Sequence, residues 1–191
     1  MSSSLRIGIY PHKLQNRHTS EESRFRNYLK ARYLKNQNQY MHYLLLYQYV
    51  EKHGDLLYEL ISKSKYAKDK KIYYIHGNIK AEEREAIRKS METENNVILI
   101  GSVGTVSTGT NIKNLHNIVF ASPSKSRVRN LQAIGRVLRL NENKDKAVLY
   151  DIADDLRYKK HINYTLLHFN ERIKIYDSEK FDYKIINVDL K

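Results

Sequence analysis

The sequence has no cysteine, no tryptophan and only two prolines. Without cysteine it can form neither a disulfide framework nor a thiolate metal site, which fits a reducing compartment. No apolar run approaches the roughly 18 residues that a transmembrane helix requires. Residues 1–10 lack the long apolar core and small-residue cleavage site of a secretory signal. We therefore expect a cytoplasmic protein with no membrane contact.

Catalytic signatures are also missing. No GxxxxGK[ST] phosphate loop occurs, and no acidic strand end precedes the motifs described below. Asp151, Asp154 and Asp155 follow an apolar run, but they come after the arginine-rich segment. No spacing of His, Asp or Glu indicates a metal cluster or a nucleophilic triad. The sequence therefore predicts no resident metal and no complete ATP site.

Positive charge is abundant. The net charge is +13, and a field of that size attracts polyanions, nucleic acid first among them. The alternative is that the charge only keeps the protein in solution. The sixteen tyrosines can stack on bases, although most are expected to be half-buried packing residues.

The length suits one domain of ordinary size with an appendage. Residues 1–40 hold eight Lys or Arg and two Glu, and Gly8 and Pro11 interrupt them. We interpret 1–40 as a basic N-terminal arm rather than packed core, with a helix from Ser20 to Leu34. A solvated extension without a partner is the alternative.

From residue 41, short apolar runs alternate with segments of helical spacing, which indicates an α/β fold with a parallel sheet flanked by helices. We place the lobe at 41–155 and a mainly helical C-terminal extension at 156–191, with an edge strand in 181–190. The expected strands are Tyr43–Tyr49, Ile72–Ile75, Val97–Ile100, Ile118–Ala121 and Ala147–Ile152. The expected helices are Asp55–Ser64, Ala81–Thr93, Arg127–Leu140 and Tyr164–Tyr176.

Functional residues of such sheets gather where strands end. The segment 100–112 follows a strand, and Gly101, Gly104 and Gly109 allow a ligand to approach the backbone closely. Its hydroxyls and N–H groups suit phosphate oxygens. A polar loop that only caps the next helix is the alternative. The hydroxyl residues are Ser102, Thr105, Ser107, Thr108 and Thr110.

A second segment lies on a predicted helix. Gln132, Arg136 and Arg139 are spaced at i, i+4 and i+7, so they share one face and can form a fork for phosphate oxygens. Gly135 costs that helix about 1 kcal/mol relative to Ala, so we expect a close neighbour there. The alternative is a basic face exposed to water.

A third segment joins a strand to a helix. Tyr74–Gly77 ends the strand, and Glu82 and Glu83 fall in the first helical turn, as the helix dipole prefers. His76 is a capping or structural residue on this evidence alone.

Together and in this order, the segments resemble the second RecA-like lobe of superfamily-2 helicases. Gln132–x–x–Gly135–Arg136–x–x–Arg139 is similar to motif VI, and Ser107–Ile112 to motif V. His76–Gly77 with Arg84 is similar to motif IVa, and Leu44–Tyr47 to motif IV. The match covers about residues 42–152. A narrower resemblance, to recombination helicases of tailed phages, continues to the end of the chain.

The resemblance implies roles for individual residues. Arg136 and Arg139 would act as arginine fingers on ATP, whose Mg²⁺ complex a missing or separate first lobe would mainly bind. The same cleft would include Gln132, Gly109 and Asn111, although the family often has Asp in place of Asn111. The implied contacts with DNA or an RNA–DNA hybrid are His76, Gly77, Arg84, Ser107, Thr108 and Gly109.

The resemblance implies a motor half of a helicase in phage recombination, repair or replication, inactive alone. Because the Walker A/B lobe is missing, the chain is a fragment, a split-gene product or a degenerate helicase. The sequence begins with Met1, and the residues that follow do not resemble a first lobe. This favours a short gene product. A non-catalytic nucleic-acid-binding or strand-annealing module is the rival reading, and a structural protein is the third.

Overall fold

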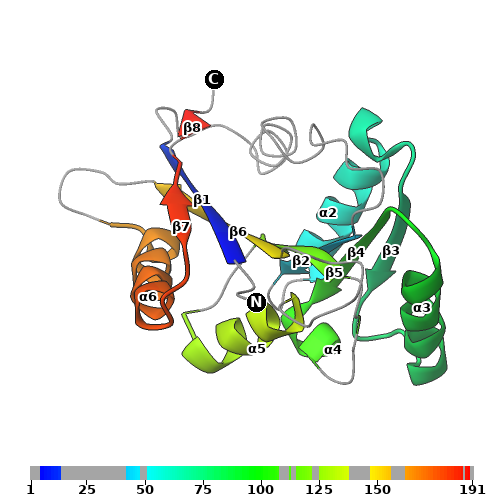
Figure 1. The fold of residues 1–191 in the computed structure, drawn as a ribbon. Coiled ribbons are helices and arrows are strands. Elements are labelled where there is room, and N and C mark those ends of the chain that lie inside the picture. The colour runs from blue at the N-terminus through cyan, green and yellow to red at the C-terminus, as the bar shows by residue number, and fades with distance from the viewer. Residues whose placement is uncertain are drawn as a thin grey trace.

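The protein forms one parallel sheet (Figure 1). The computed structural model describes residues 5–13, 42–47, 51–107, 112, 115–121, 125–137, 147–155, 162–186 and 188–189. Within them the sheet has eight strands in the order β3-β4-β2-β5-β6-β1-β7, with β8 also paired to β1, and every pairing is parallel. The strands are β1 (Leu5–Lys13), β2 (His42–Tyr47), β3 (Lys71–Ile75), β4 (Val97–Ser102), β5 (Leu115–Phe120), β6 (Ala147–Asp155), β7 (Tyr183–Ile185) and β8 (Val188–Asp189).

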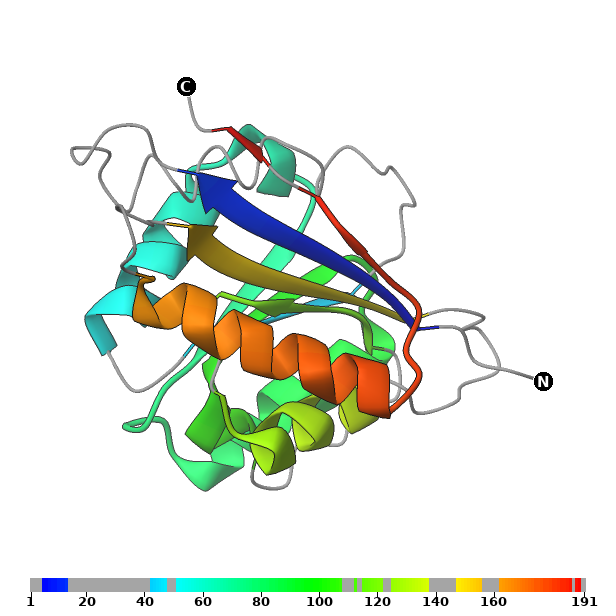
Figure 2. The same cartoon turned by 90° about the vertical axis from the view of Figure 1, so that its left-hand side faces the viewer.

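Helices flank both faces of the sheet, which confirms the predicted α/β class (Figures 1 and 2). Helix α2 packs on one face through Leu57 and Ile61, followed by the short 3₁₀ helix η2. The remaining helices contribute to the core on the opposite face. The helices are α2 (Glu51–Ser62), η2 (Lys65–Ala67), α3 (Ala81–Thr93), α4 (Val103–Ser107), α5 (Arg127–Val137) and α6 (Tyr164–Ser178). No described helix is long and apolar enough to cross a bilayer.

Strand β4 shows why the apolar runs become inner strands. Val97 and Leu99 belong to the core beneath α3–α6, whereas Ile98 and Ile100 belong to the core beneath α2. All four are buried, because alternate side chains of a strand point to opposite faces and both faces are covered.

Strand β1 differs from the expectation for the N-terminal arm. Residues 5–13 lie inside the sheet, between β6 and β7, so this part of 1–40 is not an appendage. On this side of β1, β7 pairs with Ile7–Ile9 and β8 pairs with His12–Lys13. Pro11 lies between these two paired stretches, so its missing N–H breaks no ladder bond to β7 or β8. The predicted helix from Ser20 to Leu34 lies outside the described residues.

The C-terminal extension packs closely against the lobe. Helix α6 buries Leu166, Phe169 and Tyr176 in the same core as strands β4, β5 and β6. Strand β7 lies at the edge of the sheet, which confirms an edge strand within 181–190. The domain boundaries themselves stay predictions.

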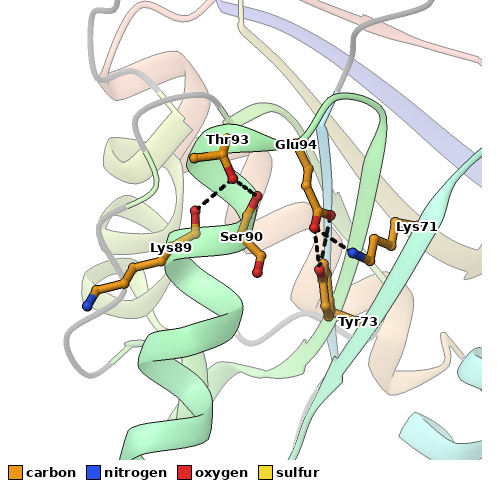
Figure 3. A network of polar contacts seen from close by, with 6 residues as sticks. All are labelled: Lys71, Tyr73, Lys89, Ser90, Thr93 and Glu94. Carbon is orange, nitrogen blue, oxygen red and sulfur yellow. Dashed lines mark hydrogen bonds and ion pairs between the residues drawn. The ribbon is translucent and has the colours of Figure 1, made fainter.

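A polar network fastens the end of α3 to β3, at the amino end of that strand (Figure 3). Glu94 forms an ion pair with Lys71 Nζ at 2.5 Å. Its two carboxylate oxygens accept hydrogen bonds from the Tyr73 hydroxyl at 3.1 and 3.0 Å. The bond to Glu94 is the main reason why the pKa of Lys71 is raised. Thr93 Oγ donates to the Ser90 carbonyl at 3.2 Å, and Glu94 N donates to the same carbonyl at 2.9 Å. The network fixes α3, whose other end begins beside the predicted site.

Candidate nucleic-acid and nucleotide interface

The turn between β3 and α3 carries the predicted site residues His76 and Gly77, and a third, Arg84, holds it from the first turns of α3. Ile79 N donates to the His76 carbonyl at 3.2 Å, and Arg84 Nε donates to the Ile79 carbonyl at 2.9 Å. His76 and Arg84 are half-buried, while Gly77 is exposed. Arg84 therefore holds the turn in place, in addition to the role that the resemblance implies for it.

The β4–α4 segment lies next to that turn. Ile75 pairs with Gly101 across the β3–β4 ladder, so the residues that follow each strand begin at the same level. The Ser102 and Thr105 hydroxyls lie 2.6 Å apart, and Thr105 N donates to Ser102 Oγ at 3.2 Å. Ser102 thus caps α4, as the capping alternative expects of this hydroxyl, and contact of the segment with phosphate stays a prediction.

Gly101 is required by packing within the protein. A Cβ at this position would lie 2.3 Å from Val106 Cγ2, and Val106 is buried at 2% exposure. The expectation that this glycine opens the backbone to a ligand is therefore wrong, because helix α4 occupies that space. A Cβ at Gly104 would find nothing within 4 Å.

Helix α5 presents a polar side to solvent. Ala133 and Ile134 are buried against the sheet, whereas Gln132 and Gly135 are exposed. A Cβ at Gly135 would find nothing within 4 Å, so the close neighbour expected there is absent from the part of the chain that the structure describes. Arg136 lies four residues beyond Gln132 and therefore on the same side of the helix axis.

Helices α4 and α5 are in contact, and they hold Ser107, the first residue of the segment similar to motif V, and residues 132–137 of the segment similar to motif VI. Ser107 and Arg136 lie within these helices, but the structure describes only their backbone. The predicted site residues outside the described part are Thr108, Gly109, Asn111 and Arg139.

A buried ionic cluster was missed by the sequence analysis. Arg172 of α6 donates through Nε and Nη2 to the two carboxylate oxygens of Asp151 at 2.6 and 2.8 Å, and the Tyr176 hydroxyl donates to Oδ2 at 2.7 Å. All three residues are fully buried, and Arg172 Cζ lies 5.8 Å from the Phe169 ring centre. A signal was available, because Leu166, Phe169, Arg172 and Tyr176 follow the spacing of one helix face, with an arginine in an apolar row.

The described residues contain no group of three or more His, Asp or Glu side chains arranged to hold a metal. Asp151 is bound to Arg172 and Tyr176, and Asp155 is buried. The described donors therefore do not fit a Mg²⁺ site.

The family is shown by comparison with known proteins. The helicase conserved C-terminal domain matches residues 23–141. The chain belongs to this helicase family. Within the family, it is 36% identical over 148 residues to the ATP-dependent DNA helicase UvsW of Enterobacteria phage T4. That alignment covers 72% of this chain and 29% of the UvsW sequence, so this helicase C-terminal domain spans less than a third of that relative.

Solved helicase structures agree with the fold. The crystal structure of T4 UvsW matches 98% of this chain and 42% of its own chain, with a TM-score of 0.70 and 25% identity. The C-terminal domain of the DEAD-box protein Dbp5 matches 97% of this chain and 89% of its own, with a TM-score of 0.63 and 12% identity. The predicted RecA-like second lobe and the resemblance to a tailed-phage recombination helicase are thereby confirmed.

Proposed function

We propose that this helicase C-terminal domain is the second motor lobe of an ATP-dependent helicase and works with a separate first lobe that binds most of the ATP–Mg²⁺ complex. The observation that carries the proposal is the solvent-facing side of α5, where Gln132 and Gly135 are exposed beside α4. Gly135 is unfavourable in a helix, and a Cβ there would meet no atom of the described residues within 4 Å, so this side suits close approach of another surface.

On the nucleotide side, Arg136 and Arg139 supply the positive charge that ATP hydrolysis needs. An arginine finger stabilises charge spread over the transferred phosphoryl group and contributes about 10³–10⁵ in rate. Gln132, Gly109 and Asn111 complete this side of the cleft. Bound Mg²⁺ neutralises phosphate charge, and its ligands belong to the first lobe.

On the nucleic-acid side, the proposed contacts are His76, Gly77, Arg84, Ser107, Thr108 and Gly109. The turn after β3 and helix α4 begin at the same level of neighbouring strands, so one bound strand can reach both. The proposed substrates are DNA or an RNA–DNA hybrid in phage recombination, repair or replication, in the host cytoplasm. Similarity to a phage DNA helicase supports this setting.

The test is nucleic-acid-stimulated ATP hydrolysis with a first lobe supplied as a separate chain. We expect no turnover by this chain alone, and turnover in the mixture that Arg139→Ala and Arg136→Ala abolish. Arg127→Ala is the matched control, because Arg127 starts the same helix and pairs with Glu179 at the surface. Unchanged hydrolysis in both finger variants would contradict the motor assignment and favour the strand-annealing module. Turnover by the chain alone would show a nucleotide site within it.

A further inference from the structure

Three aromatic rings lie in a row along the β3 edge of the sheet. Tyr58 of α2 and Tyr74 of β3 stack with ring centres 5.7 Å apart and planes inclined by 20°. The Tyr74 ring lies 5.0 Å from that of His76, with planes inclined by 44°. The two ring contacts therefore join α2, β3 and the turn that precedes α3, and α2 and β3 are neighbouring elements (Figure 1). We call these three residues the aromatic ladder.

The ladder is held in a fixed orientation. The Tyr74 hydroxyl donates to Asp55 Oδ1 at 3.0 Å, which sets the ring of the middle residue. The His76 carbonyl closes the turn through Ile79 N, and Arg84 Nε holds that turn from α3. Rings fixed in this way lose little conformational freedom when a flat ligand stacks on them.

The turn that carries the last ring is partly exposed. His76 is only partly buried, Gly77 and Asn78 are exposed, and a Cβ at Gly77 would find nothing within 4 Å. At the other end of the ladder, Tyr58 is 41% exposed. Both ends of the ladder are thus at least partly exposed. His76 follows Ile75, which pairs with Gly101, and α4 begins two residues after Gly101.

The charges around the turn favour stacking over phosphate binding. Lys80 is exposed, but the exposed Glu82 and Glu83 follow it in the first turn of α3. Arg84, which donates to the Ile79 carbonyl, adds a second positive charge, so the two carboxylates cancel the two cations and leave little net attraction for a phosphate. A nucleobase is planar and uncharged, so it can stack here without that attraction.

We propose that His76 stacks against an unpaired nucleobase of single-stranded nucleic acid, with Tyr74 and Tyr58 as positioning residues. The inference rests on the proposed nucleic-acid function and deepens it, because it assigns this turn to bases instead of phosphates. Every base has a π-face, so such a contact tolerates any sequence. It requires an unpaired base, because the faces of paired bases are covered within a duplex.

The experiment compares two labelled 12-residue DNA strands by fluorescence anisotropy with the full chain. One strand is oligo-dT, and the other has the same phosphates with an abasic site at every position. We expect the full chain to bind the dT strand about tenfold more tightly than the abasic strand. His76→Ala and Tyr74→Leu should remove most of this ratio by weakening the dT strand far more than the abasic strand, and His76→Phe should keep it.

The control is Tyr164→Ala on α6, which removes a tyrosine 80% exposed and outside the ladder, and it should keep the full ratio. A His76→Ala protein that keeps the ratio, or weakens both strands equally, would overturn the stacking role while the nucleic-acid function stands. The stacking role would also be overturned if Tyr164→Ala lost the preference for the dT strand over the abasic strand while His76→Ala kept it. Failure of the unaltered chain to bind either strand would overturn the nucleic-acid function itself.

Discussion

A single methyl group at Gly101 would collide with helix α4. The added Cβ would lie 2.3 Å from the branched side chain of Val106, which is buried and cannot swing away. We expect Gly101→Ala to lower the free energy of unfolding by about 1–3 kcal/mol, as overpacked cores do. Urea unfolding measures it, with Gly104→Ala as the control, because a Cβ at Gly104 has open space. Equal stability of the two variants would contradict the packing role of Gly101.

The buried pair between Asp151 and Arg172 supports a second prediction. Asp151→Asn leaves the guanidinium buried without a counter-charge, so we expect a loss of about 3–5 kcal/mol in the free energy of unfolding. Glu179→Gln removes a partly exposed pair with Arg127 and should cost less than about 1 kcal/mol. Thermal and urea unfolding of both variants give the comparison. Similar losses would show that burial of the cluster is unimportant.

Tyr176 makes a third prediction, which depends on pH. Burial, and then the charge of Asp151, raises the pKa of Tyr176 well above its ordinary value. The unfolded chain therefore loses this proton above about pH 10 while the folded protein keeps it. The stability that neutral Tyr176 contributes is complete below pH 10 and falls as the pH rises toward the folded-state pKa.

Tyr176→Phe has no such proton to lose. The stability difference between the unaltered protein and this variant should therefore shrink by about 1 kcal/mol between pH 8 and pH 11. The other tyrosines and the lysines titrate in both proteins and cancel in the difference. Urea unfolding at the two pH values measures it, and a constant difference would contradict the argument.

At the scale of elements, helix α6 is part of the lobe's core. Leu166, Phe169 and Tyr176 share one buried cluster with strands β4, β5 and β6. We expect a chain that ends at Asp155 to lose cooperative thermal unfolding, because that apolar face would be left in water. A chain that ends at Ile186 keeps α6 and β7 and is the matched control. A cooperative transition in the shorter chain would show that the extension is separable.

The elements that the sequence predicted best are those with a regular spacing of apolar residues. Helix α3 occupies the expected residues, and β3 and β4 extend the expected runs by one or two residues. Strand β1 was missed because Gly8 and Pro11 outweighed the alternation of Leu5, Ile7 and Ile9, which does indicate a strand. Its position beside β6 depends on a pairing between distant parts of the chain, which no local pattern encodes.

The parts of the candidate site that lie within one sequence motif could be predicted. The parts that depend on contacts between different helices and strands could not. The spacing of Gln132 and Arg136 correctly predicted a helix, and the exposure of Gln132 fits a face free to meet another surface. The stacking of Tyr58 on Tyr74 joins α2 to β3 and could not be read from either segment alone. The same holds for Arg172, whose partner lies on another element.

At the scale of the whole molecule, the net charge of +13 should govern affinity for nucleic acid. Lysine and arginine release counterions when they neutralise phosphates, so binding weakens as salt rises. We expect affinity for a DNA strand to fall at least about tenfold between 50 and 200 mM salt. Anisotropy titrations at four salt concentrations give the slope, with an uncharged peptide-backbone analogue of the strand as control. A flat slope would mean that the charge is incidental.

The pairing of β1 with β6 constrains how the protein is made. Residues 5–13 are synthesised long before their neighbours in the sheet, which are residues 147–155 and 183–185. At roughly 5–20 residues per second, the first strand waits about 7–28 seconds before β6 has emerged. Contacts between such distant parts of a chain also form slowly. The sheet can therefore close only after residues 147–155 have emerged, and until then the nascent strand offers its unpaired edges to chaperones.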